Sequence, residues 1–166
     1  MDLFLVLRAE QPDDESFIRK LFVESRFAEF SLLPWTPSQK ELFLHHQFGL
    51  QTAYYRMNYP AAAFSIVQLE NFPIGRLYVN RADPEIRVID ITLAEKYRNR
   101  GIGGSLLRTL LAEARATGRL VRLHVERSNP ALRLYQRLGF RDIQEKGIYL
   151  EMEWRAPMDG GNFPGH

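Results

Sequence analysis

The chain has 166 residues, of which 45% are hydrophobic and 25% are charged, and its formal net charge is +2. This composition is typical of one globular domain with a sizeable core, and the near-balanced charge argues against a broad nucleic-acid-binding surface. The sequence contains no cysteine, which excludes disulfides, thiolate metal sites and a cysteine nucleophile.

The first half of the chain is expected to contain four strands and two helices. A proline followed by three acidic residues at 12–15 marks a helix start, and apolar residues at helical spacing carry this helix to about Phe27. Ser38 can cap a second helix over residues 37–55. Residues 70–73 are expected to join two strands as a hairpin. The strands expected here are residues 3–7, 62–69, 74–79 and 85–93.

The second half is expected to contain two helices and three strands. Apolar residues recur at helical spacing from Ile102 to Ala114, and this helix ends near Gly118. Asn129 supplies an N-cap for the next helix, with a proline at the first helical position, and Gly139 ends it. The strands expected here are residues 121–125, 140–146 and 148–154.

The order of these elements is β-α-α-β-β-β-α-β-α-β-β. It predicts an α/β (α+β mixed) fold with a central mixed sheet of about seven strands and four flanking helices, and it excludes a regular doubly wound repeat. We expect a single domain over residues 1–156. Gly-Gly and Pro-Gly pairs in residues 157–166 predict a flexible tail.

Residues 98–104, Arg-Asn-Arg-Gly-Ile-Gly-Gly, join an expected strand to an expected helix. Backbone N–H groups at a helix start have no intrahelical partner, and the helix dipole adds positive charge there. Glycines let a ligand approach this backbone closely, and arginines add charge-assisted donors. The pattern therefore indicates a phosphate-binding loop. A glycine-rich turn with solvated arginines is the alternative interpretation.

Two well-known phosphate loops do not match this stretch. A Walker A loop needs a lysine after its glycines, and none follows here. A dinucleotide-binding loop needs a third glycine where Leu106 stands and an acidic residue where Val121 stands. The pattern that remains is R-x-x-G-x-G at the start of a helix.

This loop and residues 129–140, Asn-Pro-Ala-Leu-Arg-Leu-Tyr-Gln-Arg-Leu-Gly-Phe, together resemble the GCN5-related N-acetyltransferase (GNAT) superfamily. The family's Q/R-x-x-G-x-G/A loop corresponds to Arg98 through Gly103. Its N-x-x-A/S-x-x-x-Y-x-x-x-G-F pattern corresponds to Asn129 through Phe140, with the departure that the alanine stands directly after the proline. The expected element order matches the family over residues 3–154.

The resemblance implies that acetyl-CoA is the donor, held in a cleft where the parallel strands at 85–93 and 121–125 splay apart. The pyrophosphate would then meet the loop amides, with added charge from the two arginines and a hydroxyl from Ser105. The pantetheine amides would pair with the backbone of Ile91 and Leu93, while Asn129 would contact the pantetheine arm and Tyr135 would point towards the sulfur. The expected cofactor-binding residues are Ile91, Leu93, Arg98, Asn99, Arg100, Gly101, Ile102, Gly103, Gly104, Ser105, Asn129 and Tyr135.

Without cysteine, the expected reaction is direct attack by a primary amine on the thioester in a ternary complex. An amine with a pKa of ~10.4 must lose a proton to attack, and a general acid should protonate the departing thiolate. The resemblance assigns the acid role to Tyr135. It does not supply the base, because the places that often hold Glu or His in relatives hold Arg87 and Ile89 here.

Glu85 shares the side-chain parity of those two positions along the strand, so it is the expected base, and a chain of waters is the alternative. The neighbouring Asp90 points the opposite way and lies in an apolar run. We therefore expect Asp90 to be a buried, hydrogen-bonded acid that pairs with an arginine.

In this family the acceptor lies beneath the first helices and the last strands, which here are rich in aromatic residues. We expect Phe30, Trp35 and Tyr149 to contact the acceptor. Aromatic residues at helical spacing more often belong to a core than to a binding site. The wider set considered for this pocket also contains Phe27, Leu33, Tyr54 and Tyr55.

No metal is expected. His45 and His46 are adjacent and so lie on different faces of a helix, and no third ligand accompanies them. No apolar run approaches the ~20 residues of a membrane span, and the lack of cysteine fits a reducing compartment. We therefore expect a cytoplasmic protein that binds neither membranes nor nucleic acids.

The sequence thus predicts an acetyl-CoA-dependent N-acetyltransferase acting on a primary amine. One alternative keeps the fold but uses a longer acyl-CoA, and another is an acyl-CoA-binding sensor or interaction module without turnover. The acceptor's identity is left open, and so is the oligomeric state, a homodimer included.

Overall fold

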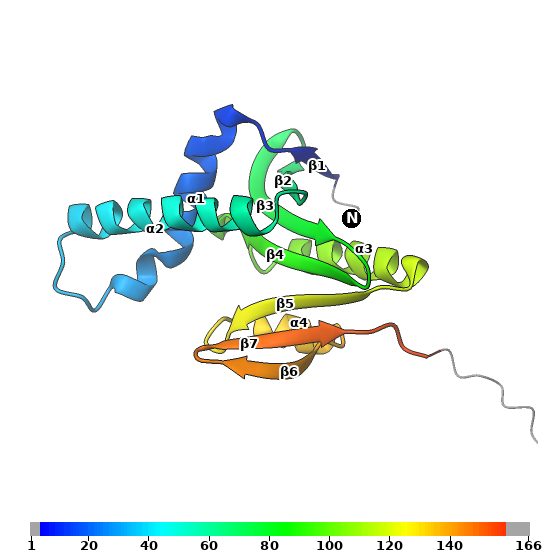
Figure 1. Cartoon of the computed structure of the whole chain (residues 1–166). Helices are drawn as coiled ribbons and strands as arrows, with labels where there is room; N and C mark the ends of the chain where they lie inside the picture. The colour runs from blue at the N-terminus through cyan, green and yellow to red at the C-terminus, as the bar shows by residue number, and fades with distance from the viewer. Residues whose placement is uncertain (1–3, 159–166) are drawn as a thin grey trace, which may run out of the picture. The chain divides into compact units, whose positions relative to one another are not determined.

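The computed structural model describes residues 4–158, and its helices and strands follow the expected order (Figure 1). The helices are α1 (Glu15–Phe27), α2 (Pro37–Asn58), α3 (Ile102–Thr117) and α4 (Leu132–Arg137). The strands are β1 (Leu5–Ala9), β2 (Ala63–Leu69), β3 (Phe72–Arg81), β4 (Glu85–Leu93), β5 (Leu120–Glu126), β6 (Arg141–Lys146) and β7 (Tyr149–Trp154). Short 3-10 helices are η1 (Pro12–Asp14), η2 (Ala28–Phe30) and η3 (Glu95–Tyr97).

The seven strands are ordered β1-β2-β3-β4-β5-β7-β6 in one sheet. The pairs β1–β2, β2–β3, β5–β7 and β6–β7 are antiparallel. The seven strands of this one sheet and the four helices of the described chain confirm the expected mixed sheet with flanking helices. Of the tail expected over residues 157–166, residues 159–166 lie outside the described residues.

Several element ends differ from the expected ones, for local reasons. Glu70 and Asn71 have φ values of 51° and 70°, so they form a two-residue turn, and the following residues already belong to β3. Helix α2 is capped by Thr36 rather than Ser38, because Thr36 Oγ1 accepts from the Gln39 backbone N–H at 3.2 Å. Helix α2 also continues three residues beyond the expected end, to Asn58.

The described chain divides into two compact units. Unit 1 comprises residues 4–80 and 88–103, and unit 2 comprises residues 81–87 and 104–158. Strand β4 and helix α3 therefore each contribute residues to both units. The single domain expected over residues 1–156 stays a prediction.

The core of unit 1 is built where α1 and α2 pack on each other and on β2. Phe22 of α1 and Phe48 of α2 meet edge to face, with ring centroids 5.6 Å apart. Ile18, Leu44 and Ile66 complete this buried cluster. The apolar spacing that predicted α1 is thus the face that it buries.

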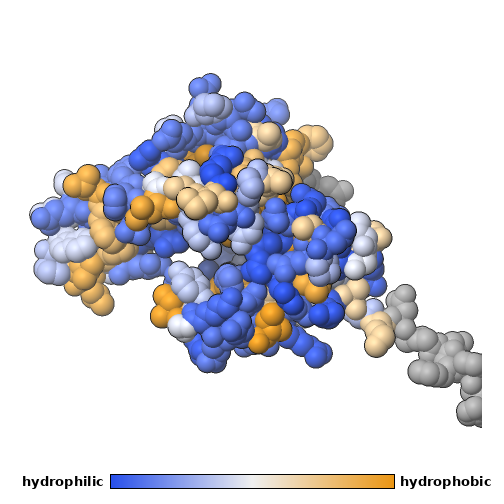
Figure 2. All heavy atoms as spheres, in the orientation of Figure 1, coloured by the Kyte–Doolittle hydropathy of each residue, from blue (hydrophilic) through white to orange (hydrophobic). Residues whose placement is uncertain are grey.

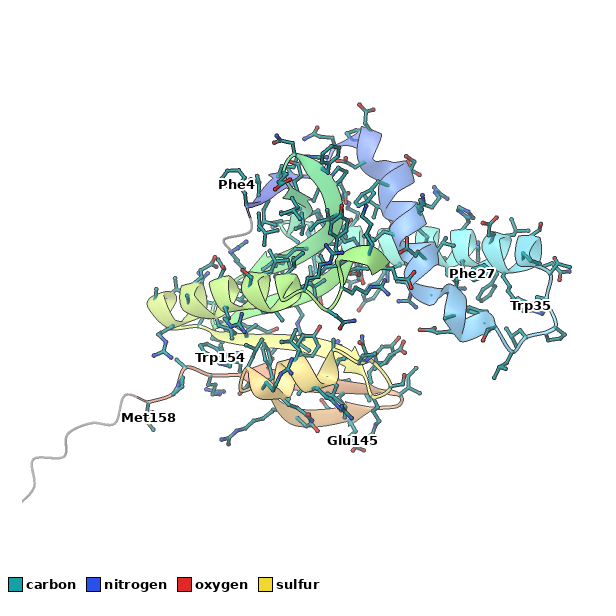
Figure 3. All side chains as sticks on the ribbon, turned by 180° about the vertical axis from the view of Figure 1, so that it is seen from behind. Phe4, Phe27, Trp35, Glu145, Trp154 and Met158 are labelled. Carbon is teal, nitrogen blue, oxygen red and sulfur yellow. The ribbon has the colours of Figure 1, made fainter. Side chains whose placement is uncertain are left out.

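The core of unit 2 follows the alternation of its strands. Val121, Leu123 and Val125 of β5 are buried, and the buried apolar residues of β7 are Leu150, Met152 and Trp154. Helix α4 covers one face of these strands, as Figures 1 and 3 show from the two sides. Most of the alternate residues are charged or polar and lie on the opposite face, which no helix of unit 2 covers within the described residues.

Gly75 marks a close approach between β3 and β4 inside unit 1. A Cβ atom at this position would lie 2.4 Å from the backbone oxygen of Thr92 and 2.8 Å from Leu93 Cδ2. Backbone cannot yield as a flexible side chain can, so the two strands can reach this separation only with glycine at position 75. Gly49, in contrast, lies inside α2 with open space where its Cβ would be.

Alanine at these two glycines should therefore have opposite effects on stability. Gly75→Ala should lower the free energy of unfolding by about 1–3 kcal/mol through overpacking. Gly49→Ala should raise it by about 1 kcal/mol, because alanine has the higher helix propensity. Urea denaturation of the two variants and the parent protein measures both changes. A Gly75→Ala protein as stable as the parent would contradict the close approach of β3 and β4.

Candidate functional site

The loop that leads into α3 has an unusual backbone. Asn99 and Gly101 have φ values of 60° and 81°, while Arg100 between them does not enter the left-handed region. Alternation of this kind turns successive backbone N–H groups towards one side and forms a concavity suited to anions. A Cβ at Gly101 would meet nothing within 4 Å, so glycine is needed there for its φ value and not for space.

The loop passes directly into the first turn of α3. Ile102 is buried and anchors the helix start, whereas Ser105 is exposed. The first N–H groups of the helix have no intrahelical acceptor, and the helix dipole places positive charge at the same end. The expected phosphate-binding residues therefore do form one continuous loop and helix start.

The two arginines of the loop are held by local contacts. Arg98 Nε donates to the backbone oxygen of Leu93 at 3.0 Å, which ties the loop to the last residue of β4. The Arg100 guanidinium lies 5.7 Å from the ring centroid of Tyr97. Guanidinium groups carry five donors, so Arg98 keeps its terminal nitrogens for another partner.

Asp90 of β4 is the buried acid expected from its place in an apolar run. Its Oδ2 accepts from Arg76 Nη2 at 2.8 Å and from the Tyr55 hydroxyl at 3.0 Å, and its Oδ1 accepts from Thr92 Oγ1 at 2.6 Å. Burial, and next the charge of Asp90, raise the pKa of Tyr55 above its usual value. The expected pairing of Asp90 with an arginine is confirmed, and Tyr55 of the wider aromatic set belongs to this network.

Two of the aromatic residues expected at the acceptor, Phe30 and Trp35, lie together in unit 1. Phe30 and Trp35 stack with ring centroids 6.2 Å apart, and Phe43 meets both edge to face. Figure 3 shows Phe27 and Trp35 at the end of unit 1 where α1 gives way to α2. Apolar side chains reach the surface in the same region (Figure 2), with Leu32 96% exposed. Tyr149 is 40% exposed and belongs to β7 of unit 2.

Unit 2 carries the two residues expected to contact the pantetheine arm and the sulfur. Asn129 Oδ1 accepts from the Ala131 N–H at 2.9 Å, so it caps a turn, and helix α4 begins later than expected, at Leu132. Tyr135 is buried on α4, with its ring edge to face against Phe140 at 5.8 Å. Tyr135 therefore lies on the helix-covered side of the unit 2 strands.

Glu85, the expected base, is held by two arginines. Its Oε1 accepts from Arg87 Nε at 2.8 Å, and its Oε2 accepts from Arg122 Nη1 at 3.2 Å. Each carboxylate oxygen of Glu85 is thus already paired with an arginine. The base role expected for Glu85 stays a prediction.

The open face of unit 2 instead presents a histidine beside a carboxylate. His124 on β5 stands opposite Glu151 on β7, and its Nε2 lies 3.5 Å from Glu151 Oε2. Burial opposes ionisation of Glu151, but hydrogen bonds from Arg87 and Lys146 bring its pKa to about 2. Glu151 is therefore charged at neutral pH and can hold the Nε2–H of His124, which leaves Nδ1 to accept a proton.

Burial lowers the pKa of His124 below 6.5, and the charges of Arg87 and Lys146 lower it further against the opposing charge of Glu151. The imidazole is therefore neutral at pH 7 and able to act as a base. Strand alternation alone places position 124 on the face opposite Leu123 and Val125. The pairing with Glu151, however, depends on the register of β5 with β7, and that register cannot be read from either strand.

The described residues show neither a metal cluster nor a membrane span. Over residues 4–158, no three His, Cys, Asp or Glu side chains lie together in a way that could hold a metal ion. His45 Nδ1 lies 3.4 Å from Arg19 Nη1. In the same range no helix is long and apolar enough to cross a membrane.

Known structures share this fold. The N-acetyltransferase PaiA from Thermoplasma acidophilum, solved in complex with coenzyme A, matches with a TM-score of 0.67 at 17% identity, over 93% of this chain and 99% of that one. The ribosomal-protein-S18-alanine N-acetyltransferase from Escherichia coli matches with a TM-score of 0.59 at 18% identity, over 96% of this chain and 98% of that one. At these identities the likeness concerns the fold.

Sequence comparison gives the family. A mycothiol acetyltransferase from Corynebacterium glutamicum (strain R) is 38% identical over 79 residues, which are 46% of this chain and 27% of that protein. The chain therefore spans about a quarter of the length of this relative. The model of the acetyltransferase (GNAT) family matches residues 16–140. The match covers most of the chain, and the chain therefore belongs to the acetyltransferase (GNAT) family.

Proposed function

We propose that this protein is an acetyl-CoA-dependent N-acetyltransferase that moves an acetyl group to a primary amine by direct attack in a ternary complex. The observation that carries the proposal is the loop at residues 98–104, whose left-handed residues lead into the start of α3, where the first backbone N–H groups have no intrahelical acceptor. A pyrophosphate needs several donors and positive potential in one place. Family membership supports coenzyme A as the molecule that brings that pyrophosphate.

In this proposal the backbone amides of Arg100, Gly101, Gly103 and Gly104 bind the pyrophosphate, and the arginine side chains and Ser105 add donors. The pantetheine amides pair with the backbone of Ile91 and Leu93 and reach Asn129. The Leu93 oxygen already accepts from Arg98 Nε. A carbonyl oxygen has two lone pairs, so it can keep this contact and also accept from a pantetheine amide.

Proton transfer then falls to two residues on opposite sides of β5. His124 on the open face takes the proton of the amine as the nitrogen attacks the thioester carbonyl. The carbon–sulfur bond breaks, and Tyr135 on the helix-covered face protonates the departing thiolate. We prefer His124 to Glu85 as the base because both oxygens of Glu85 are bound by arginines. The acceptor side is proposed to include Phe30, Trp35 and Tyr149.

Release of free thiol tests the function directly. The protein mixed with acetyl-CoA and a panel of primary amines should release coenzyme A thiol with at least one amine, followed by a thiol-reactive dye. The protein has no cysteine, so its own side chains give no background signal. Thermal stabilisation by coenzyme A without any turnover would indicate the sensor instead. A longer acyl-CoA that outperforms acetyl-CoA would correct the donor.

Removal of the Arg98 side chain should weaken coenzyme A binding. Arg98→Ala loses a charge-assisted donor worth ~1.5–3 kcal/mol, which corresponds to roughly ten- to a hundredfold in Kd. Isothermal titration calorimetry with coenzyme A measures the change. Arg141→Ala, on the exposed strand β6, makes the same charge change elsewhere and serves as the control. Equal affinity in Arg98→Ala and the parent would remove the phosphate assignment.

Substitution of His124 should remove the acidic step from the pH profile of the reaction. In the parent protein kcat/KM should fall as pH drops through the pKa of His124, below 6.5, because the protonated imidazole cannot accept a proton. His124→Gln should lower kcat by about 10²–10⁴-fold and lose this step in the pH profile. Coenzyme A affinity should not change.

Two further variants separate the proposed roles. Glu85→Gln should keep the acidic step in the pH profile, since Glu85 is paired with arginines. Tyr135→Phe should lower kcat while the acidic step persists. A His124→Gln enzyme with full turnover would rule out His124 as the base, and a Glu85→Gln enzyme without the acidic step would assign the base to Glu85.

A further inference from the structure

The carboxylate of Asp90 joins three structural elements of unit 1. It binds Arg76 on β3 and Tyr55 on α2, and it also binds the side chain of Thr92, two residues further along β4. Gln51 of α2 extends the network, because its Oε1 accepts from Arg76 Nη2 at 2.9 Å. One side chain therefore links β4 to both its neighbouring strand and the helix above it.

This network is costly for the fold. The Arg76 side chain is 3% exposed, and its Nε is buried without a hydrogen-bond partner. Unpaired buried donors destabilise a protein, and a buried ion pair adds little net stability compared with apolar residues of the same size. The contacts of Asp90 therefore explain a fixed position of the β4 backbone better than they explain the stability of unit 1.

The residues beside Asp90 are fixed by separate contacts. The Thr92 backbone lies against Gly75, where even a Cβ would be too close. The oxygen of Leu93 accepts from Arg98 Nε at 3.0 Å, and the Ala94 N–H donates to the Ile74 oxygen at 2.8 Å. Residues 90–94 are thus held by the side chain of Asp90 at one end and by the contacts of Thr92, Leu93 and Ala94 towards the other end. Within them lie Ile91 and Leu93, the two residues proposed to pair with pantetheine.

We propose that Asp90 is a positioning residue for the donor, acting with Arg76, Tyr55 and Thr92 to hold the backbone of Ile91 and Leu93 ready to pair with pantetheine. This inference rests on the proposed function, and it assigns the network to one part of the coenzyme. The proposed pyrophosphate contacts belong to the loop and the start of α3, whereas the hydrogen-bond partners of Asp90 lie on β3, α2 and β4. Disturbing Asp90 should therefore affect pantetheine binding selectively.

Two ligands separate this role from general loss of structure. Coenzyme A contains pantetheine, whereas adenosine 3′-phosphate 5′-diphosphate keeps the pyrophosphate and lacks it. Asp90→Asn should bind coenzyme A about tenfold more weakly, the effect of losing about one well-placed hydrogen bond. Its affinity for the diphosphate should equal that of the parent. Isothermal titration calorimetry gives both values.

A second variant and a control keep the test sharp. Thr92→Val removes only the 2.6 Å hydrogen bond to Asp90 at nearly constant volume, and it should weaken coenzyme A binding in the same direction. Asp14→Asn is the control. Asp14 is as buried as Asp90, with side chains 11% and 10% exposed, and it binds Arg8 through both oxygens at 2.7 and 2.8 Å. It should lose stability and keep both affinities.

The outcomes are distinct. Parent-like coenzyme A affinity in both Asp90→Asn and Thr92→Val, or equal weakening of the two ligands, overturns the positioning role and leaves the proposed function intact. A parent protein that binds neither ligand overturns the proposed function, and the positioning role with it.

Discussion

The first N–H groups of α3 have no intrahelical carbonyl to accept their hydrogen bonds, and the preceding loop is shaped around these donors. The chain reaches this helix start through Asn99 and Gly101. Both have positive φ values, which are tolerated well only by residues with a short side chain or none. Arginines stand on the loop, and one of them is tied back to the end of β4. A negatively charged group is what such an arrangement can bind, and a pyrophosphate satisfies several donors at once.

The two units use buried and exposed charge in different ways. Unit 1 encloses the Arg76–Asp90 pair and so fixes a stretch of backbone, at the cost of an unpartnered nitrogen. Unit 2 places Arg87, Lys146 and the buried Glu151 around His124, whose own side chain is 42% exposed. A buried pair is suited to holding geometry, whereas a half-exposed histidine among charges is suited to exchanging protons near neutral pH.

The order of the helices and strands could be read from the sequence because each depends on signals within a few residues. Apolar spacing predicted the face that α1 buries, and Gly118 and Gly139 marked where helices end. The ends were less accurate where two local signals competed. Thr36 and Ser38 can both cap a helix, and the reciprocal hydrogen bonds with Gln39 decided for Thr36.

By itself the sequence determined the fold class, the loop at 98–104 and the buried role of Asp90, because each follows from residue type and spacing along one segment. Only the tertiary structure decided which partners meet across segments. It paired Glu85 with Arg122, brought Glu151 beside His124 and gave Asp90 its contact with Tyr55. Strand register and helix packing determine which of these side chains come into contact. A shift of one residue in register would turn every side chain of a strand to the other face, and nothing in a single strand's sequence records its partner.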